Sequence, residues 1–305
     1  MEKLLSICMA TYDDYDGVFF TIQALRMYHP ICNTDKVEFI VLDSNPQGKH
    51  GETCKSFTNS LRGCGKYIPK TSGTISSFNK YDTINFAQGK YILILDCHVL
   101  LQSNAIDVLI SHYRQNPNCK DLIQGPLLYD DLKNISTHFK PGWSGDMYGT
   151  WSTDKANYDK GKPFEIQMNG MGLCSFERKN WPGISPYFKG FGAEEGYIAE
   201  KFRQNGGKNI CIPQLGWCHR FGRPNGVKYP LSLEDRIWNY FIGWLEIKDD
   251  PEDEMIHSIY DYFKTRIPEA RLQRILKQAV RQNELHKQIK QTQNQGANNA
   301  NPIPQ

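Results

Sequence analysis

The chain has 305 residues, of which 39% are hydrophobic and 23% charged, so it can bury a sizeable core and is not a disordered protein. Its 36 basic and 33 acidic side chains give a net charge of +3, so the chain as a whole is not a polycation. A nucleic acid could therefore bind only through a local basic patch. The mean hydropathy is −0.57 and the apolar runs are far too short to cross a bilayer, so we expect no transmembrane segment. No signal-peptide pattern precedes the first apolar run, and the nine cysteines include no Cys-x-x-Cys pair, which favours reduced thiols and a cytoplasmic location.

In the first half of the chain, short apolar runs alternate with helical stretches. This pattern is typical of an α/β fold with a mostly parallel central sheet flanked by helices. Gly89 is expected to end a helix, and Pro30 and Pro117 each follow one. In chain order we expect a strand at 4–9, a helix at 19–28, a strand at 37–42, a helix at 77–88, a strand at 91–95, a helix at 105–115 and a strand at 122–129.

The middle of the chain, residues 130–162, is rich in Gly, Trp, Tyr, Asp and Lys and lacks clear periodicity. A loop of this length is usually functional or disordered, and its aromatic residues favour a functional loop on the acceptor side of a site. The aromatic residues are Phe139, Trp143, Tyr148, Trp151 and Tyr158. After this region we expect a strand at 168–176, a helix at 195–204 and a strand at 209–212.

The composition shifts after residue 249, where an acidic cluster precedes a basic, helical stretch. Residues 264–290 carry eight Lys or Arg against Glu269 and Glu284, a local net charge of +6. This helix could pair with a polyanion such as nucleic acid or an anionic lipid surface, or pack as an ordinary amphipathic helix on the rest of the chain. We therefore expect a catalytic domain at 1–248, a helical extension at 249–291 and a disordered tail at 292–305.

Acidic residues follow three of the predicted strands. Asp13 and Asp14 follow the first, Asp43 the second and Asp96 the third. Ligands of open α/β sheets bind just beyond the carboxyl ends of the strands, so these side chains indicate one polar site, although Asp also favours turns and helix N-termini. Asp96 and His98 are two residues apart, so they can share a divalent cation such as Mn²⁺.

These motifs resemble a known enzyme family. The segments 7–12, 41–44 and 87–98 look like the nucleotide-sugar half of a GT-A glycosyltransferase of the family-2 superfamily. The form Asp96-Cys97-His98 resembles the Asp-x-His motif of the polypeptide N-acetylgalactosaminyltransferases. Segments 170–176, 190–195, 212–213 and 219–221 are similar to the second half of that family, with Phe191, Ala193 and Glu195 replacing its Trp, Gly and Asn.

The resemblance implies a role for each matching residue. Asp96, His98 and His219 would hold Mn²⁺ or Mg²⁺, and Arg220 and Arg223 would contact the donor phosphates. Glu194 and Glu195 would face the sugar and the acceptor hydroxyl, either as a general base in an inverting enzyme or as a sugar-binding carboxylate in a retaining one. The nucleoside would be lined by Thr11, Tyr12, Asp14 or Asp13, and Asp43.

The implied activity is metal-dependent transfer of a hexosyl or N-acetylhexosaminyl group from a nucleotide-diphosphate sugar, UDP-linked in most of the superfamily, to an acceptor hydroxyl. The acceptor would be a glycan or a hydroxymethylated DNA base. Two other interpretations compete with this one. One is a non-catalytic module that binds sugar nucleotides or glycans, and the other is a metal-dependent nucleotidyltransferase or phosphohydrolase, although no Gly-rich phosphate loop follows the first strand.

Overall fold

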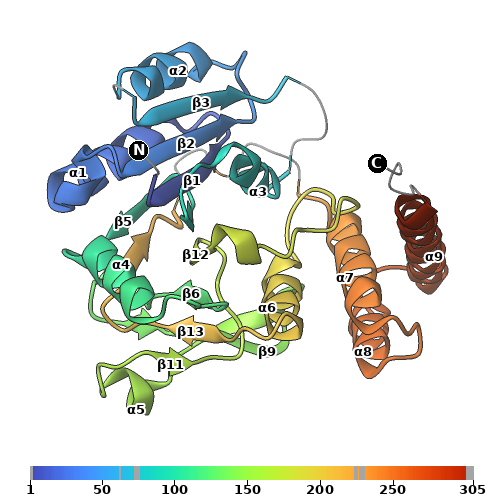
Figure 1. Ribbon diagram of the computed structural model, residues 1–305. Helices are drawn as coiled ribbons and strands as arrows, with labels where there is room; N and C mark the ends of the chain where they lie inside the picture. The colour runs from blue at the N-terminus through green and yellow to red at the C-terminus, as the bar shows by residue number, and fades with distance from the viewer. Residues whose placement is uncertain (1–2, 62, 72–75, 223–225, 227–230, 300–305) are drawn as a thin grey trace, which may run out of the picture. The chain divides into compact units, whose positions relative to one another are not determined.

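The computed structural model describes residues 3–61, 63–71, 76–222, 226 and 231–299 (Figure 1). The chain divides into two compact units. Unit 1 consists of Met1–Ile184 and Gly190–Leu231, and unit 2 consists of Ser185–Lys189 and Ser232–Gln305.

Unit 1 is built on an eight-stranded sheet in the order β11-β13-β6-β12-β4-β1-β2-β3. Strand β1 pairs in parallel with β2 and β4, and β2 pairs in parallel with β3, whereas β12 runs antiparallel to β4 and β6. The expectation of a mostly parallel sheet flanked by helices is confirmed. The strands are β1 (Leu5–Thr11), β2 (Val37–Asp43), β3 (Gly65–Pro69), β4 (Tyr91–Leu95), β6 (Leu122–Gln124), β11 (Phe164–Glu165), β12 (Leu173–Glu177) and β13 (Asn209–Cys211).

The central strands of the sheet are buried on both faces: β4 is a continuous apolar run, and β2 is apolar apart from Glu38 and its last residue, Asp43. Every residue of β2 and β4 is buried. A Cβ on Gly89, just before β4, would lie 2.5 Å from the backbone nitrogen of Ser6, so this close turn admits only glycine. The helices of unit 1 are α1 (Tyr15–Tyr28), α2 (Gly51–Asn59), α3 (Asn79–Asp82), α4 (Ala105–Gln115), α5 (Lys155–Tyr158) and α6 (Glu194–Gln204), with 3₁₀ turns η1 (Pro30–Asn33), η2 (Thr83–Phe86) and η3 (Arg178–Asn180).

Three predicted elements differ in the structure. The helix expected at 77–88 is the short α3 followed by η2, because Thr83 and Ile84 are β-branched and disfavour a continuous α-helix. The strand expected at 122–129 is two strands, since Pro126 lacks a backbone donor between them. The strand expected from 168 begins only at Leu173, beyond two glycines.

Two smaller sheets accompany the large one. The region expected to be a loop, 130–162, contains an antiparallel hairpin instead, and its positive-φ glycines and a register shift between Tyr148 and Thr150 interrupt the alternation that would have revealed it. The second sheet has the order β5-β14-β7-β8. The strands are β9 (His138–Ser144) and β10 (Met147–Ser152) in the hairpin, and β5 (Val99–Leu101), β7 (Leu127–Leu128), β8 (Ile135–Ser136) and β14 (Trp217–His219) in the second sheet.

Unit 2 is a helical unit of α7 (Leu233–Lys248), α8 (Glu254–Phe263) and α9 (Glu269–Asn299). Within this unit α7 packs on α8 and α9. The domains expected from the sequence at 1–248 and 249–291 stay a prediction. Helix α9 continues as far as Asn299, into the stretch from 292 that was expected to be a disordered tail, and residues 300–305 lie outside the described part of the chain.

Candidate functional site

A cavity of about 580 Å³ opens beyond the carboxyl ends of β1 and β4, where the sequence predicted a polar site. Its lining comes from the loops that follow β1 and β4, from the start of α6 and from the residues around the end of β14. The cavity therefore brings together segments that are far apart in the chain: Thr11 and Phe221, which both line it, are separated by more than 200 residues.

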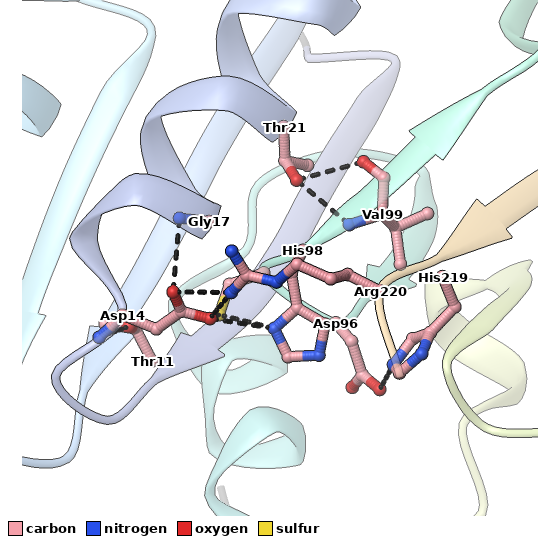
Figure 2. Close-up of polar contacts among 10 residues, drawn as sticks. Thr11, Asp14, Gly17, Thr21, Asp96, His98, Val99, His219 and Arg220 are labelled. Carbon is pink, nitrogen blue, oxygen red and sulfur yellow. Dashed lines mark hydrogen bonds and ion pairs between the residues drawn. The ribbon is translucent and has the colours of Figure 1, made fainter. Parts of the chain in front are cut away.

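Three potential metal ligands meet in this cavity. Asp96, His98 and His219 each offer one ligand atom, and these atoms lie within 4.8 Å of one another. Nε2 of His219 lies 3.3 Å from Oδ2 of Asp96, and the two imidazole rings are 4.7 Å apart between centroids (Figure 2). The structure thus brings together the three residues for which the sequence predicted a shared cation.

The second sheet explains how His219 reaches the other two residues. Strand β14 pairs antiparallel with β5, and this ladder sets His219 opposite Val99. Val99 directly follows His98, and the backbone nitrogen of Arg220 donates a hydrogen bond of 3.2 Å to the carbonyl of His98. A short ladder between strands far apart in the chain therefore fixes the histidine pair.

Asp14 orients His98. Its Oδ2 lies 2.9 Å from Nδ1 of His98, and Nη2 of Arg220 lies 2.8 Å from both oxygens of the same carboxylate. Burial alone would raise the pKa of Asp14, but the hydrogen bonds from His98 and Arg220 hold it well below its usual range. An ionised carboxylate makes Nδ1 of His98 the donor, and the opposite edge of the ring faces Asp96 and His219 (Figure 2).

A second possible cluster, Asp14 with Cys97 and His98, is less suited to a cation. The guanidinium of Arg220 already contacts both oxygens of Asp14. Because a cation would have to compete with this positive charge, the cluster around Asp96 is the better candidate.

Lys80, which the sequence analysis did not single out, is buried beside the candidate metal ligands. Its Nζ lies 3.5 Å from Oδ1 of Asp96 and 3.9 Å from Oε1 of Glu194, and donates to the carbonyl of Met171 at 2.9 Å. Burial alone would lower the pKa of Lys80, but the carboxylates of Asp96 and Glu194 raise it above its ordinary value. One feature of the sequence indicates that Lys80 is buried: it lies close to the apolar residues Tyr81 and Ile84 in a predicted helix.

The two oxygens of Asp96 have different partners: Oδ1 faces Lys80 and Oδ2 faces His219. Burial by itself would raise the pKa of this carboxyl, but Lys80 and the imidazoles of His219 and His98 hold it well below its usual range. Asp96 is therefore an anion, with one oxygen directed to the histidines.

The first turn of α6 supplies two buried carboxyl groups to the cavity, Glu194 and Glu195, which are 3% and 7% exposed. The chain enters this turn with positive φ at Gly192 and Ala193. Glycine tolerates this backbone conformation readily, which accounts for the Gly-rich segment before the helix. Both predicted acidic residues thus lie in the same cavity as the metal-ligand group.

The predicted nucleoside-binding residues divide into two groups. Thr11, Tyr12 and Asp14 line the cavity, whereas its described lining includes Ser44 but not Asp43. Asp43 is 2% exposed, and its carboxylate accepts hydrogen bonds from the backbone of Asn45 and the hydroxyl of Tyr67. Asp43 therefore holds the end of β2 in place, and a contact with the base stays a prediction.

Of the two predicted phosphate contacts, Arg220 lines the cavity and is held by Asp14. Arg223 lies outside the described residues.

Aromatic residues of the hairpin form another part of the cavity wall. Phe139, Met147 and Trp151 line it, and the rings of Phe139 and Trp151 are 4.4 Å apart between centroids. Trp151 packs directly over Gly170, where an added Cβ would lie 2.1 Å from the indole. Trp143 instead pairs with Tyr148 at 5.1 Å on the same hairpin.

The comparison with family models is decisive. The model described as "Glycosyl transferase family 2" matches residues 6–176, more than half of the chain. The chain belongs to glycosyl transferase family 2. No curated protein sequence matches this family-2 chain significantly.

Solved structures share its fold at low sequence identity. GalNAc-T7, solved with UDP, GalNAc and Mn²⁺, is 14% identical with a TM-score of 0.68, over 91% of this chain and 54% of that one. The mannosyltransferase PcManGT from Pyrobaculum calidifontis, in complex with GDP-Man and Mn²⁺, is 11% identical with a TM-score of 0.56, over 92% and 74%. TarS 1–349 from S. aureus is 12% identical with a TM-score of 0.53, over 90% and 69%. This family-2 chain spans about half the length of the GalNAc-T7 chain, and the likeness shows a GT-A fold.

The residues of the cluster fit a divalent cation of borderline hardness, because they offer one carboxylate oxygen and two imidazole nitrogens. Nε2 of His219 faces Oδ2 of Asp96 at 3.3 Å, so this nitrogen is positioned to act as a ligand together with that carboxylate. None of the helices in the described part of the chain is both long enough and apolar enough to cross a membrane.

Proposed function

We propose that this protein is a metal-dependent glycosyltransferase that moves a sugar from a nucleotide-diphosphate sugar to an acceptor hydroxyl. The observation that carries the proposal is the meeting of Asp96, His98 and His219 within 4.8 Å, in a cavity that also holds Glu194. The Mn²⁺ in the GalNAc-T7 and PcManGT structures supports a metal at this group.

In this proposal, Asp96, His98 and His219 hold Mn²⁺ or Mg²⁺, which supplies positive charge to a leaving nucleoside diphosphate. Arg220 lines the same cavity and carries a second positive charge suited to the phosphates. Thr11 and Tyr12 line the part of the cavity formed by the end of β1, where we place the nucleoside of a UDP-linked donor.

Glu194 and Glu195 supply the carboxylates that face the sugar and the acceptor hydroxyl. Their burial in the first turn of α6 favours a defined orientation. One of them acts either as a general base, as in an inverting enzyme, or as a hydrogen-bond acceptor for the sugar, as in a retaining enzyme. The anomeric configuration of the product decides between the two roles.

The acceptor side is proposed to be the hairpin wall of Phe139, Met147 and Trp151. Aromatic faces suit the ring of a glycan or of a hydroxymethylated DNA base, and both classes carry a free hydroxyl. The catalytic part is proposed to lie within residues 1–248, in the cytoplasm.

The test is release of free nucleotide from a panel of UDP- and GDP-sugars, with and without Mn²⁺. We expect Mn²⁺-dependent release with at least one donor, and its loss in Asp96→Ala and His98→Ala. His257→Ala is the matched control, because this imidazole is 59% exposed and lies outside the cavity.

Donor binding without turnover would favour the non-catalytic module. Cleavage of the same donors to a nucleoside monophosphate and a sugar 1-phosphate, in place of the nucleoside diphosphate and free sugar, would favour a nucleotidyltransferase or phosphohydrolase. Equal release without metal would overturn the roles given to Asp96, His98 and His219.

A further inference from the structure

Helix α9 in unit 2 carries a row of positive charges that the proposed activity does not use. Arg274, Lys277 and Arg281 are all exposed, and their spacing of three and four residues puts them on one face of the helix. With a rise of 1.5 Å per residue, the row extends for about 10 Å along the axis. These three residues are called the basic row below.

One acid, the exposed Glu284, lies three residues after Arg281 on α9. Within the described part of the chain, no carboxylate forms a salt bridge with any of the three. Other cations of the same unit are paired: Arg271 contacts Glu234, and Lys287 contacts Asp249. The basic row therefore leaves positive charge on α9 for a partner.

The rest of α9 shows which face is available. Leu272, Ile275 and Ala279 are buried, at 0%, 8% and 0% exposure, and Asn283 donates a hydrogen bond of 3.2 Å to the carbonyl of Leu245 on α7. These residues of the helix are thus covered by the helical unit itself, whereas Leu285 and Ile289, further along the helix, are 43% and 50% exposed. The opposite face, which carries the basic row, is open to solvent.

The residues on the open face of α9 favour one of the two polyanionic partners, a nucleic acid, over the other, an anionic membrane. A helix that lies in a membrane interface needs a wide apolar face toward the lipid, but among the described side chains of α9 the exposed large apolar residues are Leu285 and Ile289, which make a narrow patch. Beside the basic row the exposed residues include Gln273 and Gln278, and the apolar Leu285 lies one turn further on. Arg, Lys and Gln are the side chains that contact phosphates and sugars along a nucleic-acid backbone.

We infer that the basic row of α9 is a docking surface for the phosphate backbone of nucleic acid. The contact is sequence-independent, because the three side chains offer charge and hydrogen bonds to phosphates. It stands apart from the proposed transfer reaction, since it uses no residue of the cavity.

The experiment measures binding of the full chain to a labelled 30-base-pair DNA duplex by fluorescence anisotropy at several salt concentrations. Three phosphate contacts predict that affinity falls about 40-fold between 50 and 200 mM salt. The variant Arg274→Gln/Lys277→Gln/Arg281→Gln should bind at least tenfold more weakly at 50 mM salt, with the slope of log K against log salt reduced by about 2.7. Glutamine keeps the helix propensity, and circular dichroism checks the fold.

The matched control is Lys36→Gln/Lys49→Gln/Lys133→Gln, which removes the same charge from exposed positions of unit 1. We expect it to keep the affinity within about threefold and the salt slope nearly unchanged. Equal loss in both triple variants would mean that only net charge matters, and would overturn the inference.

A parallel titration with phosphatidylserine-containing vesicles tests the other polyanion. Binding to vesicles without binding to DNA would overturn the proposal in favour of a membrane surface. Unchanged DNA binding by the variant with all three basic-row residues replaced would also overturn it, because the DNA contact would then lie elsewhere. Nucleotide release from the donor should be the same in the triple variant and the wild type, so failure of the transfer proposal and failure of this one are distinguishable.

Discussion

Nδ1 of His98 lies 2.9 Å from Oδ2 of Asp14, although the two residues are 84 positions apart. Asp14 also accepts a hydrogen bond from the backbone nitrogen of Gly17 and so caps α1. One carboxylate therefore connects the start of a helix with the orientation of a proposed metal ligand.

The first prediction concerns Asp14→Asn, which keeps a good N-cap residue but removes the charge that fixes the His98 ring. We expect affinity for Mn²⁺ to fall by about 10–100-fold, as measured by electron paramagnetic resonance of free Mn²⁺ during a titration. Asp35→Asn, an exposed position outside the cavity, is the control. Unchanged affinity in Asp14→Asn would show that this hydrogen bond does not support the metal site.

The second prediction concerns the buried cation. Lys80→Met leaves the carboxylates of Asp96 and Glu194 without their shared partner, so the free energy of unfolding should fall by about 3–5 kcal/mol. Urea denaturation measures the loss, and adding Glu194→Gln should restore part of it. Lys55→Met removes an exposed pair with Glu52 and should cost less than about 1 kcal/mol. Similar losses in the two single variants would contradict a buried charge network.

The third prediction concerns the aromatic wall. Gly170→Ala places a methyl group against the indole of Trp151, so the side chain or the hairpin must shift, at a cost of about 1–3 kcal/mol. Near-ultraviolet circular dichroism and urea denaturation should both change. Gly222→Ala meets nothing within 4 Å and serves as the control. A spectrum identical to that of the wild type would mean that the indole does not depend on this glycine.

The fourth prediction concerns alkaline pH. Burial raises the pKa of the Cys8 thiol from 9.0 to about 12, so the folded state keeps this proton while the unfolded state loses it above pH 9. The stability that comes from the neutral thiol is complete below pH 9 and is lost as the pH rises toward 12. Between pH 8 and pH 10 the wild type should lose about 1.4 kcal/mol more than Cys8→Ala. Parallel losses in the two proteins would rule out this contribution.

Much of the fold follows from local pattern. The strands β2 and β4 and the helix α4 were predictable, because mainly apolar strands and helical spacing of apolar residues can be recognised directly in a sequence. The hairpin at 138–152 was not, since its twist depends on glycines and a register shift. The helix α2 and the strand β3 were also missed, because neither has a strong apolar pattern.

The candidate site likewise contains residues that could be predicted from the sequence and residues that could not. Asp96, His98 and His219 were found through a motif, and the structure brings them together. The pairing of Lys80 with Asp96 could not be read from one sequence, because it depends on how the short helix α3 packs beside β4. Long-range ion pairs leave no local periodicity.

The three-residue ladder between β14 and β5 limits how this chain can vary. Side chains alternate between the two faces of a strand, so inserting or deleting one residue beside Trp217 or Leu101 would turn the imidazole of His219 to the opposite face. Point substitutions in these strands keep that alternation. The loops before and after these two strands can therefore vary in length only if the pairing of β14 with β5 stays the same.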